Sequence, residues 1–223
     1  MAPALLMSER AQYPEDPFAL LERGTIEGIE LIPWGSNYTF AALLRGEDES
    51  CCYGVYKPRR GEVPLRDFPS GTLYKREVAA YVFATKLGWD LIPPTIVREE
   101  APHGVGSLQL YVEPHAGAAA QYDHLRESHR ADLQRMAVFD LLTNNADRKG
   151  GHCLLDIRGH LWGIDHGLTF HHVPKLRTVI WDFCGDRIPA DLVAHLATVH
   201  ADAEQMAAID TALRPFLSGH ELE

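Results

Sequence analysis

Asp147, His152 and Asp165 are the residues whose types and spacing best suit metal chemistry. Arg158-Gly159 reads as a two-residue hairpin turn with apolar-rich arms, and this turn pairs His152 with Asp165 across the hairpin. Opposed residues of an antiparallel pair have Cβ atoms about 5 Å apart, so both side chains can coordinate one divalent ion. A bulge would shift this register by one residue. We therefore predict a metal site at His152 and Asp165, with Asp147 in a glycine-ended loop that curls back over it.

A fixed cation is predicted in the N-terminal half. Lys57 ends a strand-like run, and Glu77 lies in the middle of the apolar face of a predicted helix. An inward-facing carboxylate needs a cation, so we expect Glu77 to pair with Lys57. The turn Gly35-Ser36-Asn37 offers backbone N–H groups and a hydroxyl to phosphates. Metal ions on phosphate oxygens, a fixed cation, and an acid or base near the acceptor are the parts that phosphoryl transfer needs.

The elements that position these residues follow from capping residues and periodicity. The pattern predicts an N-terminal antiparallel sheet and a largely helical second half. Predicted strands lie on both sides of the turn within residues 25–44, at 51–57, at 95–98, at 108–112 and in a hairpin within 153–164. Predicted helices lie between the cap Asp16 and the stop Gly24, between the cap Ser70 and the stop Gly88, at 131–143 and from about 189 onward.

Composition excludes several classes of protein. With 223 residues, of which 46% are hydrophobic, the chain can form one large domain or two small lobes. A net charge of −10 and the lack of a Lys/Arg cluster argue against a nucleic-acid partner. No apolar run is long enough for a membrane span, and the four cysteines form neither a CxxC pattern nor a spaced disulfide framework. We expect a cytoplasmic protein with reduced cysteines; the oligomeric state is left open.

The order of the motifs resembles a known family. The resemblance is to the phosphatidylinositol 3-/4-kinase-like group of atypical kinases, most of all to its actinobacterial members and more distantly to HipA-type kinases. The motifs that carry it, within roughly residues 24–185, are the glycine-containing hairpin, Lys57, Glu77, Asp147-Arg148 with a ligand at position 152, and Asp165-His166-Gly167. The resemblance implies an α+β, bilobal protein-kinase-like fold with an N-terminal antiparallel sheet, one helix on it, and a mainly helical C-terminal lobe.

The resemblance also implies roles for individual residues. Asp147 becomes the catalytic aspartate, Asp165 the principal metal ligand, and Gln109, Leu110, Tyr111 and Val112 the hinge that holds adenine. The implied cofactors are ATP and Mg²⁺ or Mn²⁺. His152 stands where most kinases have asparagine, and imidazole suits Mg²⁺ less well than Mn²⁺ or Zn²⁺. His166 replaces the phenylalanine of the metal-binding triplet.

The expected domains are an N-terminal arm and helix at 1–23, a nucleotide-binding N-lobe at 24–114 and a catalytic C-lobe at 115–223, with a small-residue linker at 116–120. The expected function is an ATP- and divalent-metal-dependent phosphotransferase. Its acceptor is a hydroxyl of a protein or of a small cytosolic metabolite. A lipid acceptor is disfavoured by the acidic charge and the missing membrane segment.

Two other functions fit the same residues. One is a nucleotide-binding pseudokinase that senses or scaffolds, and the other is a metal-dependent phosphohydrolase that uses water. The histidines at 152, 160, 166, 171 and 172 also invite a zinc-hydrolase interpretation, but no HExxH or HxH spacing is present.

Purely structural explanations remain open for the single residues. Lys57 alone reads as a solvated strand end, and Asp147 alone as a turn cap. Asp140 lies on the apolar side of its helix, and we interpret it as structural support for the 144–148 loop. Lys175 and Arg177, in a loop after Asp165, either attract an anionic substrate or are simply solvated.

Overall fold

The computed structural model describes residue 14 and residues 16–33, 35–117 and 120–222. The chain forms two compact units, each described by itself below. Unit 1 comprises Met1–Val78 and Pro93–Val112, and unit 2 comprises Ala79–Ile92 and Glu113–Glu223. The helix α2 (Leu73–Lys86) contributes residues to both units. The division into domains at 23/24 and 114/115 stays a prediction.

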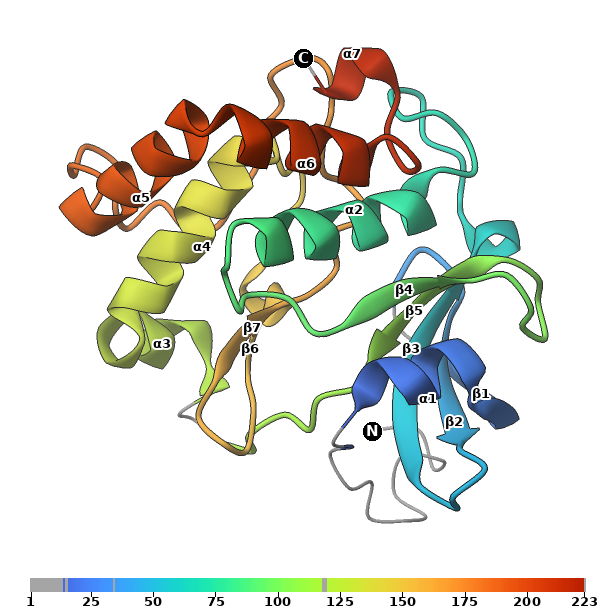
Figure 1. The fold of residues 1–223 in the computed structure, drawn as a ribbon. Coiled ribbons are helices and arrows are strands. Elements are labelled where there is room, and N and C mark those ends of the chain that lie inside the picture. The colour runs from blue at the N-terminus through green and yellow to red at the C-terminus, as the bar shows by residue number, and fades with distance from the viewer. Residues whose placement is uncertain (1–13, 15, 34, 118–119, 223) are drawn as a thin grey trace. The chain divides into compact units, whose positions relative to one another are not determined.

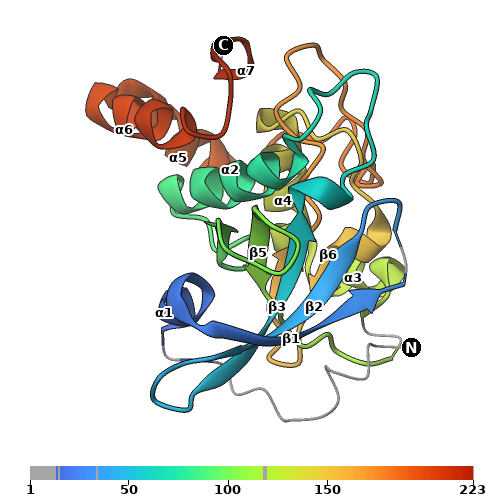
Figure 2. The same ribbon diagram turned by 90° about the vertical axis from the view of Figure 1, so that its right-hand side faces the viewer.

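Unit 1 contains a five-stranded antiparallel sheet with the order β1-β2-β3-β5-β4 (Figure 2). The strands are β1 (Thr25–Ile32), β2 (Thr39–Arg45), β3 (Cys51–Pro58), β4 (Thr95–Arg98) and β5 (Gly106–Leu110). The predicted strands are confirmed, although β5 begins and ends earlier in the chain than predicted. The predicted turn between β1 and β2 includes Trp34, which lies outside the described residues.

The helix α1 (Pro17–Arg23) lies across this sheet (Figure 1). Asp16 caps it by accepting a hydrogen bond of 3.1 Å from the Ala19 N–H, as predicted. The buried Leu20 and Leu21 pack in one hydrophobic cluster with residues of β2, β3 and β5. Burial of this apolar stripe ties the helix to the sheet.

The start of α2 differs from the prediction. The helix begins at Leu73, so Ser70 is not its cap. The Glu62 carboxylate caps it instead, because Glu62 Oε1 accepts a hydrogen bond of 2.9 Å from the Tyr74 N–H. The short helix η2 (Arg59–Gly61) precedes Glu62 directly after β3. Gly88 ends α2 as predicted, with a left-handed backbone at φ +68°.

Unit 2 is mainly helical, with a two-stranded sheet. Its elements are α3 (Tyr122–Ser128), α4 (Arg130–Leu142), η4 (Gly150–His152), β6 (Cys153–Leu155), β7 (Leu161–Gly163), α5 (Ala190–Ala201), α6 (Ala203–Leu213) and α7 (Gly219–Leu222). Its core joins α4, α5 and α6 to the part of α2 that belongs to this unit. The helix α3 was not predicted, and the predicted linker includes residues 118–119, which lie outside the described part. Within the described ranges, every helix is too short or too polar to cross a membrane.

The register of the β6–β7 hairpin corrects the prediction by one residue. Cys153 pairs with Gly163, so His152 lies opposite Ile164 and not opposite Asp165. The connection is a three-residue loop that ends at Gly159, whose φ of +82° places it in the left-handed region. Asp156 Oδ1 accepts the Arg158 and His160 N–H groups, each at 2.9 Å, which stabilises this longer loop.

Candidate functional site

His152 and Asp165 lie together despite the corrected register. His152 Nε2 and Asp165 Oδ2 are 3.2 Å apart. The imidazole is 13% exposed and the carboxylate 48% exposed, so the pair opens to solvent on the aspartate side. Asp165 adopts a left-handed backbone with φ +60°, which turns the chain just after β7. The side chains therefore meet through this turn and not through strand pairing.

The environment of His152 favours the neutral imidazole. Burial lowers the pKa of His152 below its ordinary value, and the opposing attraction of Asp165 does not restore it. The Lys149 N–H donates to His152 Nδ1 at 3.3 Å. The ring proton is thereby placed on Nε2, where it faces Asp165.

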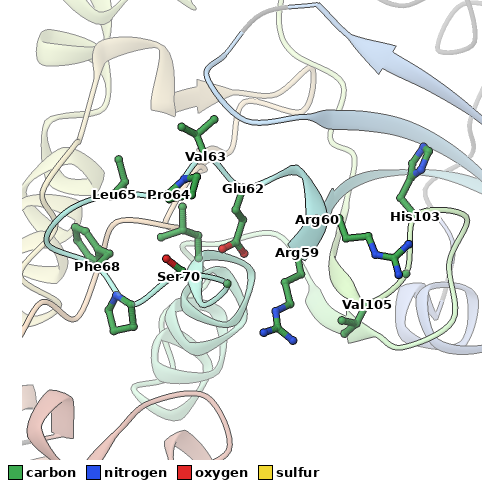
Figure 3. A pocket seen from close by; sticks show the side chains of 14 residues that line it. Arg59, Arg60, Glu62, Val63, Pro64, Leu65, Phe68, Ser70, His103 and Val105 are labelled. Carbon is green, nitrogen blue, oxygen red and sulfur yellow. The ribbon is translucent and has the colours of Figure 1, made fainter.

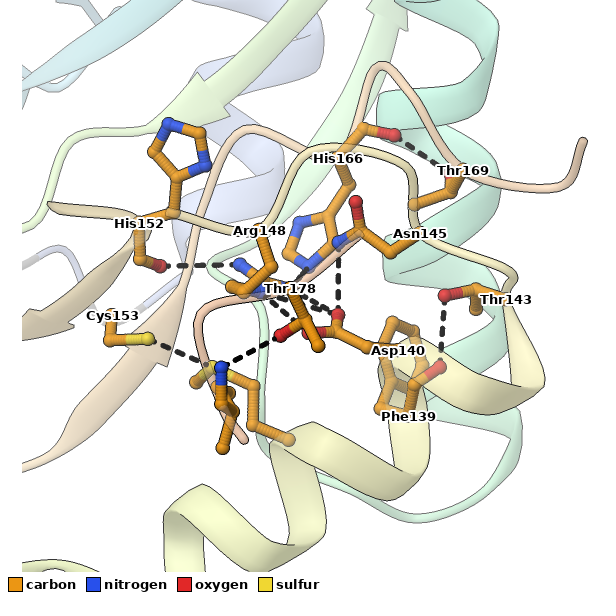
Figure 4. Close-up of polar contacts among 12 residues, drawn as sticks. Phe139, Asp140, Thr143, Asn145, Arg148, His152, Cys153, His166, Thr169 and Thr178 are labelled. Carbon is orange, nitrogen blue, oxygen red and sulfur yellow. Dashed lines mark hydrogen bonds and ion pairs between the residues drawn. The ribbon is translucent and has the colours of Figure 1, made fainter. Parts of the chain in front are cut away.

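Arg148 connects the segments around this pair (Figure 4). Its guanidinium is fully buried and forms a bidentate pair with Asp140 at 2.8 and 2.9 Å. Arg148 Nη1 also donates to the carbonyls of His152 and Ile164, at 3.3 and 3.2 Å. Arg148 Nη2 lies 2.7 Å from His166 Nε2. One arginine thus anchors the backbone on both sides of the His152–Asp165 pair to α4.

Asp140 supports the 144–148 loop, as the sequence suggested, but its carboxylate accepts side-chain hydrogen bonds from that loop and not the expected backbone ones. Its side chain accepts hydrogen bonds from Arg148 and, at 2.9 Å, from Asn145 Nδ2. The importance of Arg148 was missed, although the sequence held a signal for it. Asp140 is an inward carboxylate of a helix, and the same reasoning that paired Glu77 with Lys57 required a buried cation for it.

Asp147 is held at the edge of this network. Its N–H donates to Asn145 Oδ1 at 3.0 Å, and its side chain is 19% exposed. Asp147 Oδ2 lies 2.7 Å from Lys149 Nζ, and Asp147 Oδ1 lies 3.6 Å from Arg177 Nη1. Both cations are mostly exposed, so these ion pairs are weak and easily exchanged. Lys149 was not singled out from the sequence.

The loop after Asp165 is tied to the Asp147 segment by Asn144, a residue that sequence reasoning also missed. Asn144 Nδ2 donates to the carbonyls of His171 and Val173, both at 2.7 Å. Asn144 Oδ1 accepts the Lys175 N–H at 2.8 Å. The loop that carries Lys175 and Arg177 is therefore held beside Asp147 by side-chain bonds.

Lys57 and Glu77 meet within unit 1 as predicted. Lys57 Nζ donates to Glu77 Oε1. The glutamate side chain is only 5% exposed and that of the lysine 23% exposed. The lysine ammonium stabilises this buried carboxylate. The carboxylate in turn fixes the position of the ammonium at the end of the flexible lysine side chain.

The predicted phosphate-binding turn is exposed at Gly35 and Ser36. Gly35 has φ +115°, a conformation that favours glycine. Asn37 Oδ1 accepts the Val63 N–H at 2.8 Å, so this side chain holds the turn against the loop after η2. The hydroxyl of Ser36 and the backbone of Gly35 remain the groups suited to an anion.

The predicted hinge is partly engaged in the sheet. Gln109 Nε2 donates to Thr95 Oγ1 at 2.8 Å. The N–H groups of Leu110 and Tyr111 donate to the carbonyls of Pro94 and Tyr53, at 2.8 and 2.9 Å.

Comparison with known proteins supplies the family. The family described as phosphatidylinositol 3- and 4-kinase matches residues 7–209. The protein Rv2133c of Mycobacterium tuberculosis is 39% identical over 224 residues, which cover 85% of this chain and 79% of that protein.

Two solved structures share the fold. A hydra Fam20 protein with sugar has a TM-score of 0.64 at 15% identity, covering 91% of this chain and 82% of its own. The proinflammatory kinase CtkA of Helicobacter pylori has a TM-score of 0.56 at 12% identity, covering 91% and 89% of the two chains. These likenesses confirm the predicted α+β kinase-like fold. Since the matched region spans most of the sequence, the chain belongs to the phosphatidylinositol 3- and 4-kinase family.

Proposed function

We propose that the protein is a phosphotransferase that uses ATP and a divalent metal ion to phosphorylate a hydroxyl group. Membership of a kinase family supports the reaction class. The observation that carries the proposal is the pair His152–Asp165, whose donor atoms are 3.2 Å apart. Two cis ligands of one octahedral ion lie ~3 Å apart, because Mg²⁺–oxygen distances are about 2.1 Å. The donor set therefore fits a divalent cation whose other ligands are phosphates and water.

The proposed metal ligands are Asp165 and His152. A bound Mg²⁺ or Mn²⁺ would neutralise charge on the transferred phosphate. The lowered pKa of His152 keeps its imidazole neutral, as ligation requires. Ligation through Nε2 would require the ring proton to be on Nδ1, and the 3.3 Å bond from the Lys149 N–H would then be lost. The imidazole ligand itself would favour Mn²⁺ over Mg²⁺.

Asp147 is the proposed catalytic carboxylate. It orients the acceptor hydroxyl and accepts its proton. The exposed pairs with Lys149 and Arg177 are weak, so they give way readily when an acceptor arrives. Asn145 and Arg148 fix the backbone on which Asp147 stands.

Unit 1 is proposed to bind the nucleotide. Glu77 aims the Lys57 ammonium at the α- and β-phosphates, and Gly35, Ser36 and Asn37 contact the β- and γ-phosphates. Gln109 to Val112 are proposed as the adenine hinge. The N–H groups of Leu110 and Tyr111 already donate to carbonyls, whereas the Val112 N–H has no such bond among the described residues. Recognition of adenine is therefore assigned chiefly to the backbone of Val112.

The proposed acceptor is a protein or a small cytosolic metabolite. A net charge of −10 opposes approach to the anionic face of a membrane. Four free cysteines suit a reducing compartment, which supports the cytoplasm. A pseudokinase is the second candidate, because His152 replaces the usual asparagine and its Nε2 proton faces the metal-binding carboxylate.

Nucleotide binding tests the proposal directly. Calorimetric titration with a non-hydrolysable ATP analogue should show binding that requires Mg²⁺ or Mn²⁺. Lys57→Met should weaken that binding at least tenfold, because it removes the positively charged ammonium group proposed to contact the phosphates. The matched control Lys86→Met, at the exposed end of α2, should bind like the unmodified protein. Equal binding by both variants would contradict the role of Lys57.

A further inference from the structure

We infer that a cavity in unit 1 binds a small organic anion in which a hydroxyl group lies between an apolar ring and the charged group. The cavity has a volume of about 520 Å³, within the ~300–1,000 Å³ range of small-molecule sites. Its walls come from the segment between β3 and α2 and from the loop between β4 and β5 (Figure 3). None of the described residues that line it belongs to the proposed nucleotide site.

One side of the cavity is positively charged. Arg59 and Arg60 both line it and are exposed. Neither guanidinium forms an ion pair with another residue in the described part of the chain. The chain as a whole has a net charge of −10, so this pair of arginines is a local exception. Guanidinium groups bind carboxylates and phosphates with two parallel hydrogen bonds, which assigns the anionic end of the ligand to this side.

One of these arginines, Arg59, lies close to Gly71. A Cβ atom at Gly71 would lie 2.6 Å from Arg59 Nε, and the backbone there is left-handed with φ +74°. Only glycine leaves the space that the guanidinium fills. Arg59 is exposed, and its side chain lies against Gly71 where it lines the cavity.

Glu62 supplies a hydrogen-bond acceptor in the same cavity. Its Oε1 accepts the Tyr74 N–H at the start of α2, at 2.9 Å. Its Oε2 is buried and accepts no hydrogen bond from the residues that the structure describes. A buried carboxylate oxygen requires a donor. A ligand hydroxyl would provide one, whereas the anionic end of a ligand would be repelled.

The remaining side of the cavity is apolar. Leu65 and Phe68 lie on one side of Glu62, and Arg59 and Arg60 lie on the other (Figure 3). The order across the cavity is thus apolar wall, hydroxyl acceptor and cationic side. A ligand that matches it carries a ring, then a hydroxyl, then an anionic group.

The cavity borders both elements that hold the Lys57–Glu77 pair. Arg59 follows β3 directly, and Leu73, another lining residue, lies one helical turn before Glu77 on α2. A ligand that bridges these elements restricts their relative motion and so favours the paired lysine. This regulatory part of the inference rests on the proposed function, and it predicts that the ligand raises the affinity for ATP.

Mandelate is a suitable probe, because its hydroxyl lies between a phenyl ring and a carboxylate. Calorimetric titration in the absence of nucleotide should give a dissociation constant of about 5 mM or tighter. Phenylacetate lacks the hydroxyl, lactate lacks the ring and mandelamide lacks the charge, so each should bind at least fivefold more weakly. Arg60→Gln and Glu62→Gln should each weaken mandelate binding at least fivefold. Arg66→Gln, an exposed arginine of the same loop outside the lining, should have no effect.

Three results would overturn the ligand site: no mandelate binding, binding of the three comparison molecules as tight as that of mandelate, or equal losses of mandelate affinity in Arg60→Gln and Arg66→Gln. A second titration, of an ATP analogue with and without saturating mandelate, tests the coupling. We expect at least a threefold gain in affinity. An Arg60-dependent mandelate site without this gain would overturn the regulatory part alone, and failure of ATP binding itself would instead overturn the proposed function.

Discussion

His152 Nε2 lies 3.2 Å from Asp165 Oδ2, although strand pairing places His152 opposite Ile164. Two features outside the strand pairing bring the side chains together. The left-handed backbone of Asp165 turns the chain after β7, and Arg148 binds the carbonyls of both His152 and Ile164. The pair thus depends on a loop conformation that a buried arginine stabilises.

Asp165→Asn should abolish metal-dependent nucleotide binding, because it removes the anionic donor of the proposed metal site. Titration with an ATP analogue in Mn²⁺ measures the effect, and we expect a loss of at least tenfold in affinity. Asp132→Asn is a matched control, since that carboxylate is similarly exposed, at 44%, on α4. Unchanged metal-dependent binding by Asp165→Asn would show that the metal is held elsewhere.

Asp147→Asn should separate binding from turnover. The amide keeps the shape of the side chain but cannot accept a proton from the acceptor hydroxyl. Nucleotide affinity should stay within about twofold, whereas phosphoryl transfer should fall by about 10²–10⁴-fold, the usual contribution of a general base. If the variant transferred phosphate at the normal rate, Asp147 would not be the catalytic carboxylate.

Protonation of His152 should lower the free energy of unfolding in acid. Its folded-state pKa is lowered from the ordinary 6.5, mainly by burial. The contribution of His152 to the free energy of unfolding is fully present above pH 6.5. It is lost as the pH falls through the lower folded-state pKa, because the unfolded state binds the proton first. Urea unfolding at about pH 7.5 and pH 5 should show a smaller loss of stability in acid for His152→Asn than for the unmodified protein. His200→Asn, an exposed control at the end of α5, should leave the profile unchanged.

Arg148→Met should destabilise the fold strongly. It leaves the fully buried Asp140 carboxylate without its cation, which typically costs about 3–5 kcal/mol in the free energy of unfolding. Urea denaturation measures this change. Arg214→Met removes an exposed pair with Asp210 and should cost less than about 1 kcal/mol. Similar losses in the two variants would contradict the central position assigned to Arg148.

Local signals predicted most of unit 1 and only part of the site. The sequence predicts the cap Asp16 and the strand β3 because each depends on neighbouring residues. It also predicts the pairing of Glu77 with Lys57, because a buried carboxylate needs a cation. The hairpin register was wrong because the Arg158-Gly159 pattern fits a two-residue turn as well as the three-residue loop that the chain forms, and a glycine with positive φ suits both.

Longer-range contacts explain the other differences. The cap of α2 is Glu62, which lies eleven residues before the helix begins at Leu73. No local sequence pattern predicts a cap at that distance. Arg148 acts through α4 and through backbone carbonyls that only the folded chain brings together. Motif spacing identifies Asp147 and Asp165 as candidates, but it does not reveal the residues that anchor them.

Transfer of label from ATP tests the central claim most directly. The protein would be incubated with γ-labelled ATP, Mg²⁺ or Mn²⁺, and a lysate cleared of other kinases, beside Asp147→Asn and Lys57→Met. We predict a labelled protein or metabolite that requires the metal ion and disappears with both variants. Release of free phosphate alone, undiminished by Lys57→Met, would contradict the account and indicate a phosphohydrolase.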